Sequence, residues 1–287
     1  MDVPSLTTTL LVVAHVAITI TIVIRVLMKR PPAGVAVAWI FIASVLPYVG
    51  VILYLLIGER RVSHKRAERL AALRPSYRKA AEATIAGGHA DVDWSRHDPA
   101  ARGIDRIGCQ LVGMPTVKGN VGELFADAPS ALTAMIRDID NATTSILMEF
   151  YIWARGGLAD EVLEALVRAA GRGVMCYVLV DAIGGRPWFR SDQPKRLRQA
   201  GVKLLAAMPV GPIRTIFERL DMRLHRKIAV FDGHVAWTGS MNLVDPRFFK
   251  QDAGVGEWVD AMVRIEGPAV AALGGVMLGD WVLETGE

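Results

Sequence analysis

The chain has 287 residues, which gives room for one or two domains and a substantial core. Its hydrophobic fraction of 52% is high for a soluble protein, so the composition first indicates a membrane segment. The net charge of +4 favours a partner with a negative surface, either anionic lipid or nucleic acid. Cys109 and Cys176 form no CxxC pattern and the six histidines form no HExxH pattern, which argues for two reduced thiols and against a metal or another cofactor.

Two apolar runs open the sequence. Residues 6–27 match the roughly 20 residues that a helix needs to cross a bilayer, and residues 35–57 form a second run that contains Pro47 and Gly50. The alternative for the first run is a cleaved signal peptide, but it lacks a basic start and an Ala-x-Ala site. The alternative for the second is a buried helix. We expect residues 1–58 to form a transmembrane hairpin of two helices.

A basic stretch follows the second run. Residues 60–79 contain eight Lys and Arg, residues 1–5 contain none, and the short loop holds Lys29 and Arg30. The larger basic cluster predicts that both termini lie in the cytoplasm. Residues 59–103 are expected to form two short helices divided by Pro75, followed by a glycine-rich linker. This stretch either attracts anionic headgroups, at about 1 kcal/mol per basic residue, or is simply solvated.

From residue 104 onward, apolar strands alternate with amphipathic helices. This alternation predicts an α/β domain over residues 104–287 with a mixed, largely parallel sheet flanked by helices. In such sheets, functional sites gather at strand ends and in the loops beyond them. The expected helices are 129–141, 158–171 and 194–200, and the expected strands are 145–153, 174–180 and 202–206.

A hairpin near the C-terminal end carries the densest group of reactive side chains. Residues 224–231 are predicted to be a strand, Asp232 and Gly233 a tight turn, and residues 235–238 the returning strand. His225 and Lys227 are two residues apart on the first strand, so both project from one face. A nucleophile and a cation placed in this way can bind the same anion.

Asn242 follows the returning strand after the small pair Gly239 and Ser240. Small residues let the backbone approach a ligand closely, and their N–H groups suit a phosphate. We therefore expect Gly239 and Ser240 to bind substrate beside Asn242.

The order HxK, four residues, Asp, six residues, GSxN resembles the HKD motif of the phospholipase D superfamily. Other segments resemble the cardiolipin synthases of that superfamily, and the resemblance extends over essentially the whole chain. These segments are residues 148–152, 180–184, 242–252, 258–260 and 264–268.

The resemblance implies a role for each motif residue. His225 is expected to attack a phosphodiester and form a phosphohistidine, while Lys227 and Asn242 neutralise the developing charge. Asp232 is expected to fix the turn. Asp260 is the candidate that orients the second nitrogen of His225, the alternative being a structural ion pair with an arginine. This scheme needs no metal.

By resemblance, the reaction is phosphatidyl transfer between two phosphatidylglycerol molecules, which gives cardiolipin and glycerol. The substrate is a membrane lipid, and nucleic acid is not an expected partner. The implied location is a bacterial-type cell membrane, with a multi-pass anchor and a cytoplasmic catalytic domain.

Family enzymes carry two HKD motifs, whereas this sequence has one; His64 and Lys65 lack the motif spacing. The chain looks like the first half of a longer enzyme. Three hypotheses remain: a half-length synthase completed by a second copy or a partner chain, a homodimeric single-motif phosphodiesterase or nuclease, and a non-catalytic membrane subunit that binds anionic lipid.

Other charged residues stay outside the predicted catalytic set. Glu149 and Asp181 either line the pocket or hydrogen-bond to loops. The arginines near the motif either contact anionic headgroups or form a solvated basic face. They are Arg214, Arg219, Arg223 and Arg226.

Overall fold

The computed structural model describes residues 6–58, 64–209, 223–254 and 257–287, and these fall into two compact units. The first unit contains the described residues before residue 59. The second consists of His64–Pro209 and Arg223–Glu287. Arg214 and Arg219, two of the arginines considered for headgroup contact, lie outside the described residues.

The first unit begins with α1 (Leu6–Lys29), a helix of 24 residues. Its length is about 36 Å, enough to cross the hydrocarbon core of a bilayer, and within the described ranges it alone is both long and apolar enough to do so. Most of its apolar side chains are exposed, and buried Ile22 and Val26 join a small cluster with Ala43 and Tyr54.

The second apolar run is not one long helix. It consists of α2 (Ala33–Val45), α3 (Pro47–Leu53) and a π-helical turn, Tyr54–Gly58. The break falls at Leu46, which has φ −126° and ψ 70° and precedes Pro47. A residue before proline disfavours the helical region, which explains the break.

The second unit begins with α4 (His64–Ala86), which runs without interruption through Pro75. The expected division into two short helices is therefore wrong. Contacts with the C-terminal helix α11 (Ala269–Thr285) stabilise α4 on both sides of the proline. Arg66 Nη1 lies 2.6 Å from Glu284 Oε1, and the Tyr77 hydroxyl donates to the Gly275 carbonyl at 3.0 Å. Tertiary packing here outweighs the local cost of an interior proline.

A seven-stranded mixed sheet forms the centre of the second unit, in the order β1-β7-β6-β5-β2-β3-β4. The β2–β3 and β3–β4 pairs are parallel, and the other four pairs are antiparallel. The mixed α/β architecture is confirmed, but parallel pairing is confined to one side of the sheet. The strands are β1 (Val121–Phe125), β2 (Ser145–Phe150), β3 (Met175–Asp181), β4 (Lys203–Ala207), β5 (Ile228–Phe231), β6 (Val235–Gly239) and β7 (Met262–Glu266).

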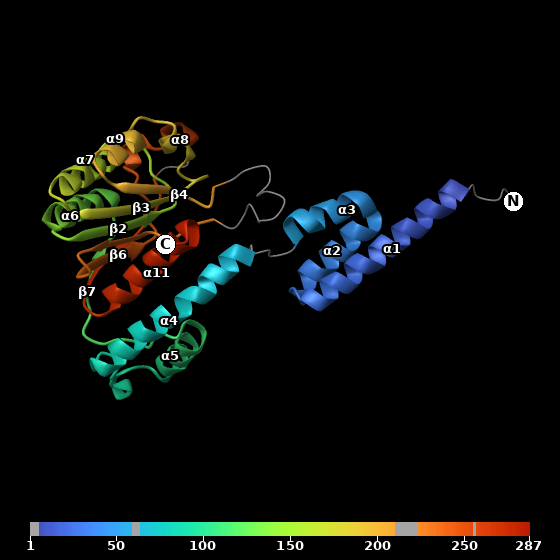
Figure 1. Ribbon diagram of the computed structural model, residues 1–287, viewed down its shortest axis with the longest axis horizontal. Coiled ribbons are helices and arrows are strands. Elements are labelled where there is room, and N and C mark those ends of the chain that lie inside the picture. The colour runs from blue at the N-terminus through green and yellow to red at the C-terminus, as the bar shows by residue number, and fades with distance from the viewer. Residues whose placement is uncertain (1–5, 59–63, 210–222, 255–256) are drawn as a thin grey trace. The chain divides into compact units, whose positions relative to one another are not determined.

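Helices cover both faces of this sheet (Figure 1). On one face lie α6 (Ala128–Asn141), α7 (Leu158–Gly171) and α9 (Gln193–Gln199), which match the three expected helices. On the other face α11 packs against β2, β5, β6 and β7, and α4 packs against α11. The described part of this unit has two further α-helices, α5 (Pro99–Val112) and α8 (Arg186–Phe189); α5 begins within the stretch expected to be a linker.

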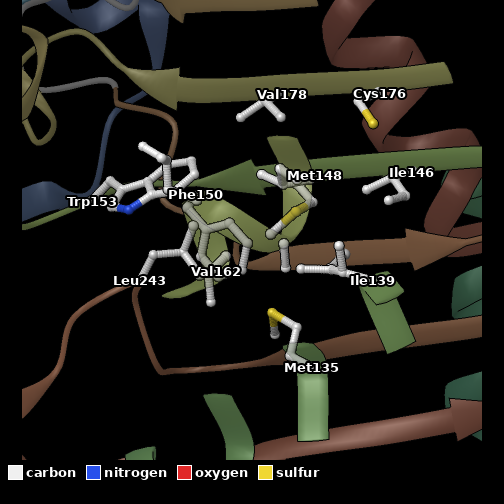
Figure 2. Close-up of a cluster of buried hydrophobic side chains, with 14 of the residues drawn as sticks. Met135, Ile139, Ile146, Met148, Phe150, Trp153, Val162, Cys176, Val178 and Leu243 are labelled. Atoms are coloured by element: carbon white, nitrogen blue, oxygen red, sulfur yellow. The ribbon is translucent and has the colours of Figure 1, made fainter. Parts of the chain in front are cut away.

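The main core lies between the sheet and the layer of α6 and α7 (Figure 2). Ile146, Met148 and Phe150 alternate along β2, so all three point into this layer. Leu147 and Glu149 must therefore point to the opposite face, under α11. The alternation thus buries an acidic side chain in the layer between the sheet and α11.

A polar contact joins α6 to the antiparallel side of the sheet. Asp138 accepts hydrogen bonds from Trp237 Nε1 at 2.7 Å and from Arg264 Nε and Nη2 at 2.8 and 3.0 Å. Trp237 is fully buried and Arg264 is largely buried, so the carboxylate satisfies donors on β6 and β7 that water reaches poorly.

We predict that Asp138→Ala lowers the free energy of unfolding by about 3 kcal/mol, because it leaves the Nε and Nη2 groups of Arg264 and the indole N–H of Trp237 without their acceptor. Urea unfolding of the full chain in detergent measures this loss. Asp140→Ala is the matched control on the same helix, since Asp140 pairs with Arg168 at the surface and its loss should cost less than about 1 kcal/mol. Equal losses in the two variants would contradict the assignment.

Candidate active site

The pairing of the strands brings the candidate residues to one edge of the sheet. Because β5 is antiparallel to β2 and β6, the start of β5 lies beside the ends of those two strands: Ile228 pairs with Glu149 and with Thr238. The start of β7 reaches the same edge, where Met262 pairs with Gly239. The segments before β5 and β7 therefore meet the segments after β2 and β6.

His225 and Lys227 lie in the segment that precedes β5, not within the strand as expected. They are still adjacent: Lys227 Nζ is 3.2 Å from His225 Nδ1 and donates to the His225 carbonyl at 2.8 Å. The Tyr151 ring packs 4.8 Å from the imidazole, centroid to centroid, and its centroid is 5.6 Å from Lys227 Nζ. Tyr151 was not predicted from the sequence as a site residue. The only signal for it was its place in the 148–152 segment that resembles the family.

Exposure differs between the two motif residues. His225 is exposed, whereas Lys227 is 3% exposed. Burial lowers the pKa of Lys227, and the negative charge of Asp260 acts in the opposite direction. The arrangement keeps an ammonium close to an accessible imidazole, as binding of an anion beside a nucleophile requires.

Asn242 is oriented by the chain segment that follows β2. Its Oδ1 accepts a hydrogen bond from the Ile152 N–H at 2.9 Å, so its amide NH₂ points away from that backbone. The adjacent Leu243 donates to the Ile152 carbonyl at 3.1 Å and accepts from the Ala154 N–H at 3.0 Å. These bonds fix Asn242 next to the segment that carries Tyr151.

Gly239 and Ser240 bind the chain just before β7. The Ser240 N–H donates to the Ala261 carbonyl at 2.9 Å, and the Ser240 hydroxyl accepts from the Ala261 N–H at 3.0 Å. A Cβ at position 239 would lie 2.2 Å from the Ala261 carbonyl oxygen, so the close approach requires glycine. These contacts place the neighbouring Asp260. Substrate binding by Gly239 and Ser240 stays a prediction.

Asp260 lies half-buried before β7, close enough to act electrostatically on Lys227. The ring nitrogen Nδ1 of His225 has Lys227 as its neighbour, so orientation of His225 by Asp260 stays a prediction.

Asn242 and Asp260 also line a pocket beside the motif. Other side chains around this pocket are Asp127, Phe249, Lys250, Glu257 and Trp258. Within the described ranges, no group of three or more His, Cys, Asp and Glu could hold a metal ion.

Asp232 fixes the far end of the hairpin. Its two carboxylate oxygens accept five hydrogen bonds, from the N–H and hydroxyl groups of Thr143 and Thr144 and from the Ser145 N–H, at 2.8 to 3.0 Å. Its backbone is left-handed, with φ 53°. Partial burial acts to raise the pKa of Asp232, but the hydrogen bonds outweigh it and hold the pKa below its usual range. The contacts fit the structural role expected for Asp232.

Asp181 and two arginines hold the segment that leads to the motif. Asp181 is fully buried at the end of β3 and accepts from the Leu224 N–H at 3.1 Å and from Arg223 Nη2 at 2.8 Å. Arg223 is thus in an ion pair within the fold. Arg226 pairs with Asp280 and lies 3.8 Å from Glu149. Arg223 fits neither of the two alternatives for these arginines, because it is ion-paired within the fold. Arg226 is half exposed and is also ion-paired.

Comparison with known proteins shows what this arrangement resembles. Residues 135–272, which include all five candidate catalytic residues, match the family described as cardiolipin synthase, phospholipase D-like domain. Residues 17–59 match the family described as phospholipase D-nuclease N-terminal.

Full-length relatives show a similar match over part of their length. Cardiolipin synthase A of Salmonella arizonae and that of Salmonella paratyphi B are each 42% identical to this chain over 266 residues, which is 93% of this chain and 54% of theirs. The chain therefore spans about half the length of the curated relatives it matches. The crystal structure of Nuc, a phospholipase D family member from Salmonella typhimurium, aligns with a TM-score of 0.43 and 21% identity, covering 57% of this chain and 95% of Nuc.

We predict that Asp232→Asn lowers the free energy of unfolding at pH 7 by about 2 kcal/mol, because an amide puts an NH₂ against backbone donors. The sign of the pH dependence follows from the lowered pKa in the folded state. The contribution of Asp232 is present above the unfolded pKa of about 3.9 and is lost as the pH falls below it. The difference between wild type and variant, measured by urea unfolding, should therefore shrink below about pH 4. A constant difference between pH 7 and pH 3 would contradict this assignment.

Proposed function

Since this chain resembles the N-terminal half of the cardiolipin synthases of the phospholipase D superfamily, we propose that it transfers a phosphatidyl group between two phosphatidylglycerol molecules, yielding cardiolipin and glycerol. The observation that carries the proposal is the pairing of exposed His225 with buried Lys227 beside Asn242, inside the segment that matches the cardiolipin synthase domain.

In the first step, an imidazole nitrogen of His225 attacks the phosphorus of one phosphatidylglycerol. The P–N bond forms as the bond from phosphorus to the glycerol headgroup breaks, and glycerol leaves with a proton from a general acid. In the second step, a headgroup hydroxyl of the other phosphatidylglycerol attacks the phosphohistidine as its proton passes to the group that acted as general acid; the new P–O bond forms as the P–N bond breaks, and His225 is released. Lys227 and the Asn242 amide stabilise the added charge on the non-bridging oxygens in both steps.

The general acid comes from outside the single motif of this sequence. We assign it to a second HKD half, supplied by another copy of the chain or by a partner chain. This assignment agrees with the exposure of His225 and with the position of the motif at the ends of β2 and β6. It also agrees with the length of the relatives, about twice the matched part.

The substrate places the reaction at a membrane. Helix α1 supplies one segment of sufficient length, and the broken second run, α2 and α3, supplies the rest of an apolar anchor. We propose a multi-pass anchor in a bacterial-type cell membrane with the catalytic unit in the cytoplasm.

We predict that the full chain, reconstituted in phosphatidylglycerol vesicles, forms cardiolipin at a concentration that drives assembly, and that His225→Ala reduces the rate at least about 1000-fold. Asn242→Ala should reduce it about 100-fold, through the loss of one charge-stabilising donor. His234→Ala is the matched control, since His234 is an exposed histidine on the turn after β5. Chromatography of the lipid products provides the measurement.

The outcomes separate the competing hypotheses. Cardiolipin formation that survives His225→Ala removes His225 as the nucleophile. Release of nucleotides from DNA in place of cardiolipin favours a phosphodiesterase, and no product at any concentration favours a lipid-binding subunit. In mixtures of wild type and His225→Ala, activity that falls with the square of the wild-type fraction shows that two copies each supply a histidine.

A further inference from the structure

Glu149 is a buried acid that the proposed reaction does not use. It lies on the face of β2 that α11 covers, and it is 0% exposed. Within the part of the chain that the structure describes, neither of its carboxylate oxygens has a regular hydrogen-bond partner. An ionised carboxylate in such a place is costly, because burial removes its hydration and no regular hydrogen bond replaces it.

Among the described residues, the surroundings of Glu149 hold one cation for two acids. Asp280 reaches the same site from α11 and is 7% exposed. Arg226 pairs with Asp280, and its Nη1 lies 3.8 Å from Glu149 Oε1. Tyr77 comes from α4; burial, and then the charge of Asp280, raise the pKa of its hydroxyl. If both acids were ionised, the buried cluster would carry a net negative charge, which one retained proton removes.

The cluster lies directly under the candidate catalytic segment. Arg226 stands between His225 and Lys227 in the sequence, and Glu149 pairs across the sheet with Ile228, the next residue along. The side chain of Arg226 therefore points away from those of His225 and Lys227, towards the two acids. Whatever fixes Arg226 also fixes the backbone that presents His225 and Lys227.

We propose that Glu149 keeps its proton at neutral pH beside the Asp280–Arg226 ion pair, and that the two acids position the His225–Lys227 segment on the sheet. Glu149 and Asp280 are thus positioning residues for the site. The inference rests on the proposed function only in calling that segment catalytic. Burial, and then the negative charge of Asp280, raise the pKa of Glu149 to about 9, with Arg226 acting in the opposite direction.

The retained proton has a measurable effect on unfolding. The folded chain holds a proton that the unfolded chain releases above about pH 4.3, so Glu149 should make stability fall as the pH rises from about 4.5 to about 9. Over most of that range the effect is about tenfold in the unfolding equilibrium constant per pH unit. Glu149→Gln mimics the neutral acid and should remove this slope. Urea unfolding of the full chain in detergent, from pH 5 to pH 9, measures it.

Infrared spectroscopy tests the proton directly. A protonated carboxyl band should be present in wild type at pH 7 and absent in Glu149→Gln. Glu164→Gln is the control, because Glu164 pairs with Arg196 at the surface, and it should keep both the slope and the band. A Glu149→Gln variant with the wild-type slope and the wild-type band would overturn the proposal.

Positioning is tested by the reactivity of Lys227 towards an amine-acylating reagent, read by mass spectrometry. The Lys227 amine should react about tenfold faster in Asp280→Asn, because loss of a charged hydrogen bond eases local opening of the segment. Glu149→Gln should leave the reaction rate of Lys227 unchanged. An unchanged rate in Asp280→Asn would overturn the positioning role. None of these measurements depends on cardiolipin formation. If the proposed function failed its own test, the proton on Glu149 and the positioning role of Asp280 could still be measured.

Discussion

The insertion of β5 between β2 and β6 is the constraint on which the rest of the site depends. This strand has four residues, all buried, and it is hydrogen-bonded on both sides. Because β5 runs against β2, the chain before it emerges where β2 and β3 end. A parallel β5 would have placed His225 and Lys227 at the opposite edge, away from Asn242 and Asp260. One local choice of strand direction thus assembles residues from four separate segments.

Carboxylates hold this short strand at both ends. Asp232 ties the turn after β5 to the start of β2, and Asp181 ties the backbone before the motif to the end of β3. Between them, Asp280 and Glu149 surround Arg226. The motif segment is therefore held mainly through polar groups, which fix direction and register more tightly than apolar contact does. The arrangement leaves His225 exposed while its backbone is restrained.

The sequence predicted what depends on local pattern and missed what depends on long-range contact. The 3.6-residue periodicity gave α7 with its exact bounds, and apolar runs located β2 and β3 within a few residues. Strand β1 is exposed along most of its length, so it shows no alternation of buried and exposed positions. Helix α11 has apolar residues all round, which gives no amphipathic signal.

The same distinction applies to the site. The spacing of His225, Lys227 and Asn242 is a local pattern, so the sequence alone is enough to predict that they act together. The charged residues around Glu149 and Asp181 come from positions 42 to 131 residues away, and no pattern in one sequence marks such pairs. The predicted helix break at Pro75 was wrong for a related reason, since the contacts that keep α4 continuous come from α11.

The contrast between His225 and Lys227 indicates what an assembled site would gain. Lys227 is already buried in the protein interior, which lowers its pKa, whereas His225 faces solvent. The attraction between an ammonium and a phosphodiester grows as water is excluded, because the effective dielectric constant falls. In the proposed reaction, a second half placed over these strand ends would enclose the phosphorus, supply the general acid and strengthen the contact of Lys227 with the substrate. In the proposed reaction, this half supplies a restrained nucleophile and its cation, and the rate depends on the surface that covers them.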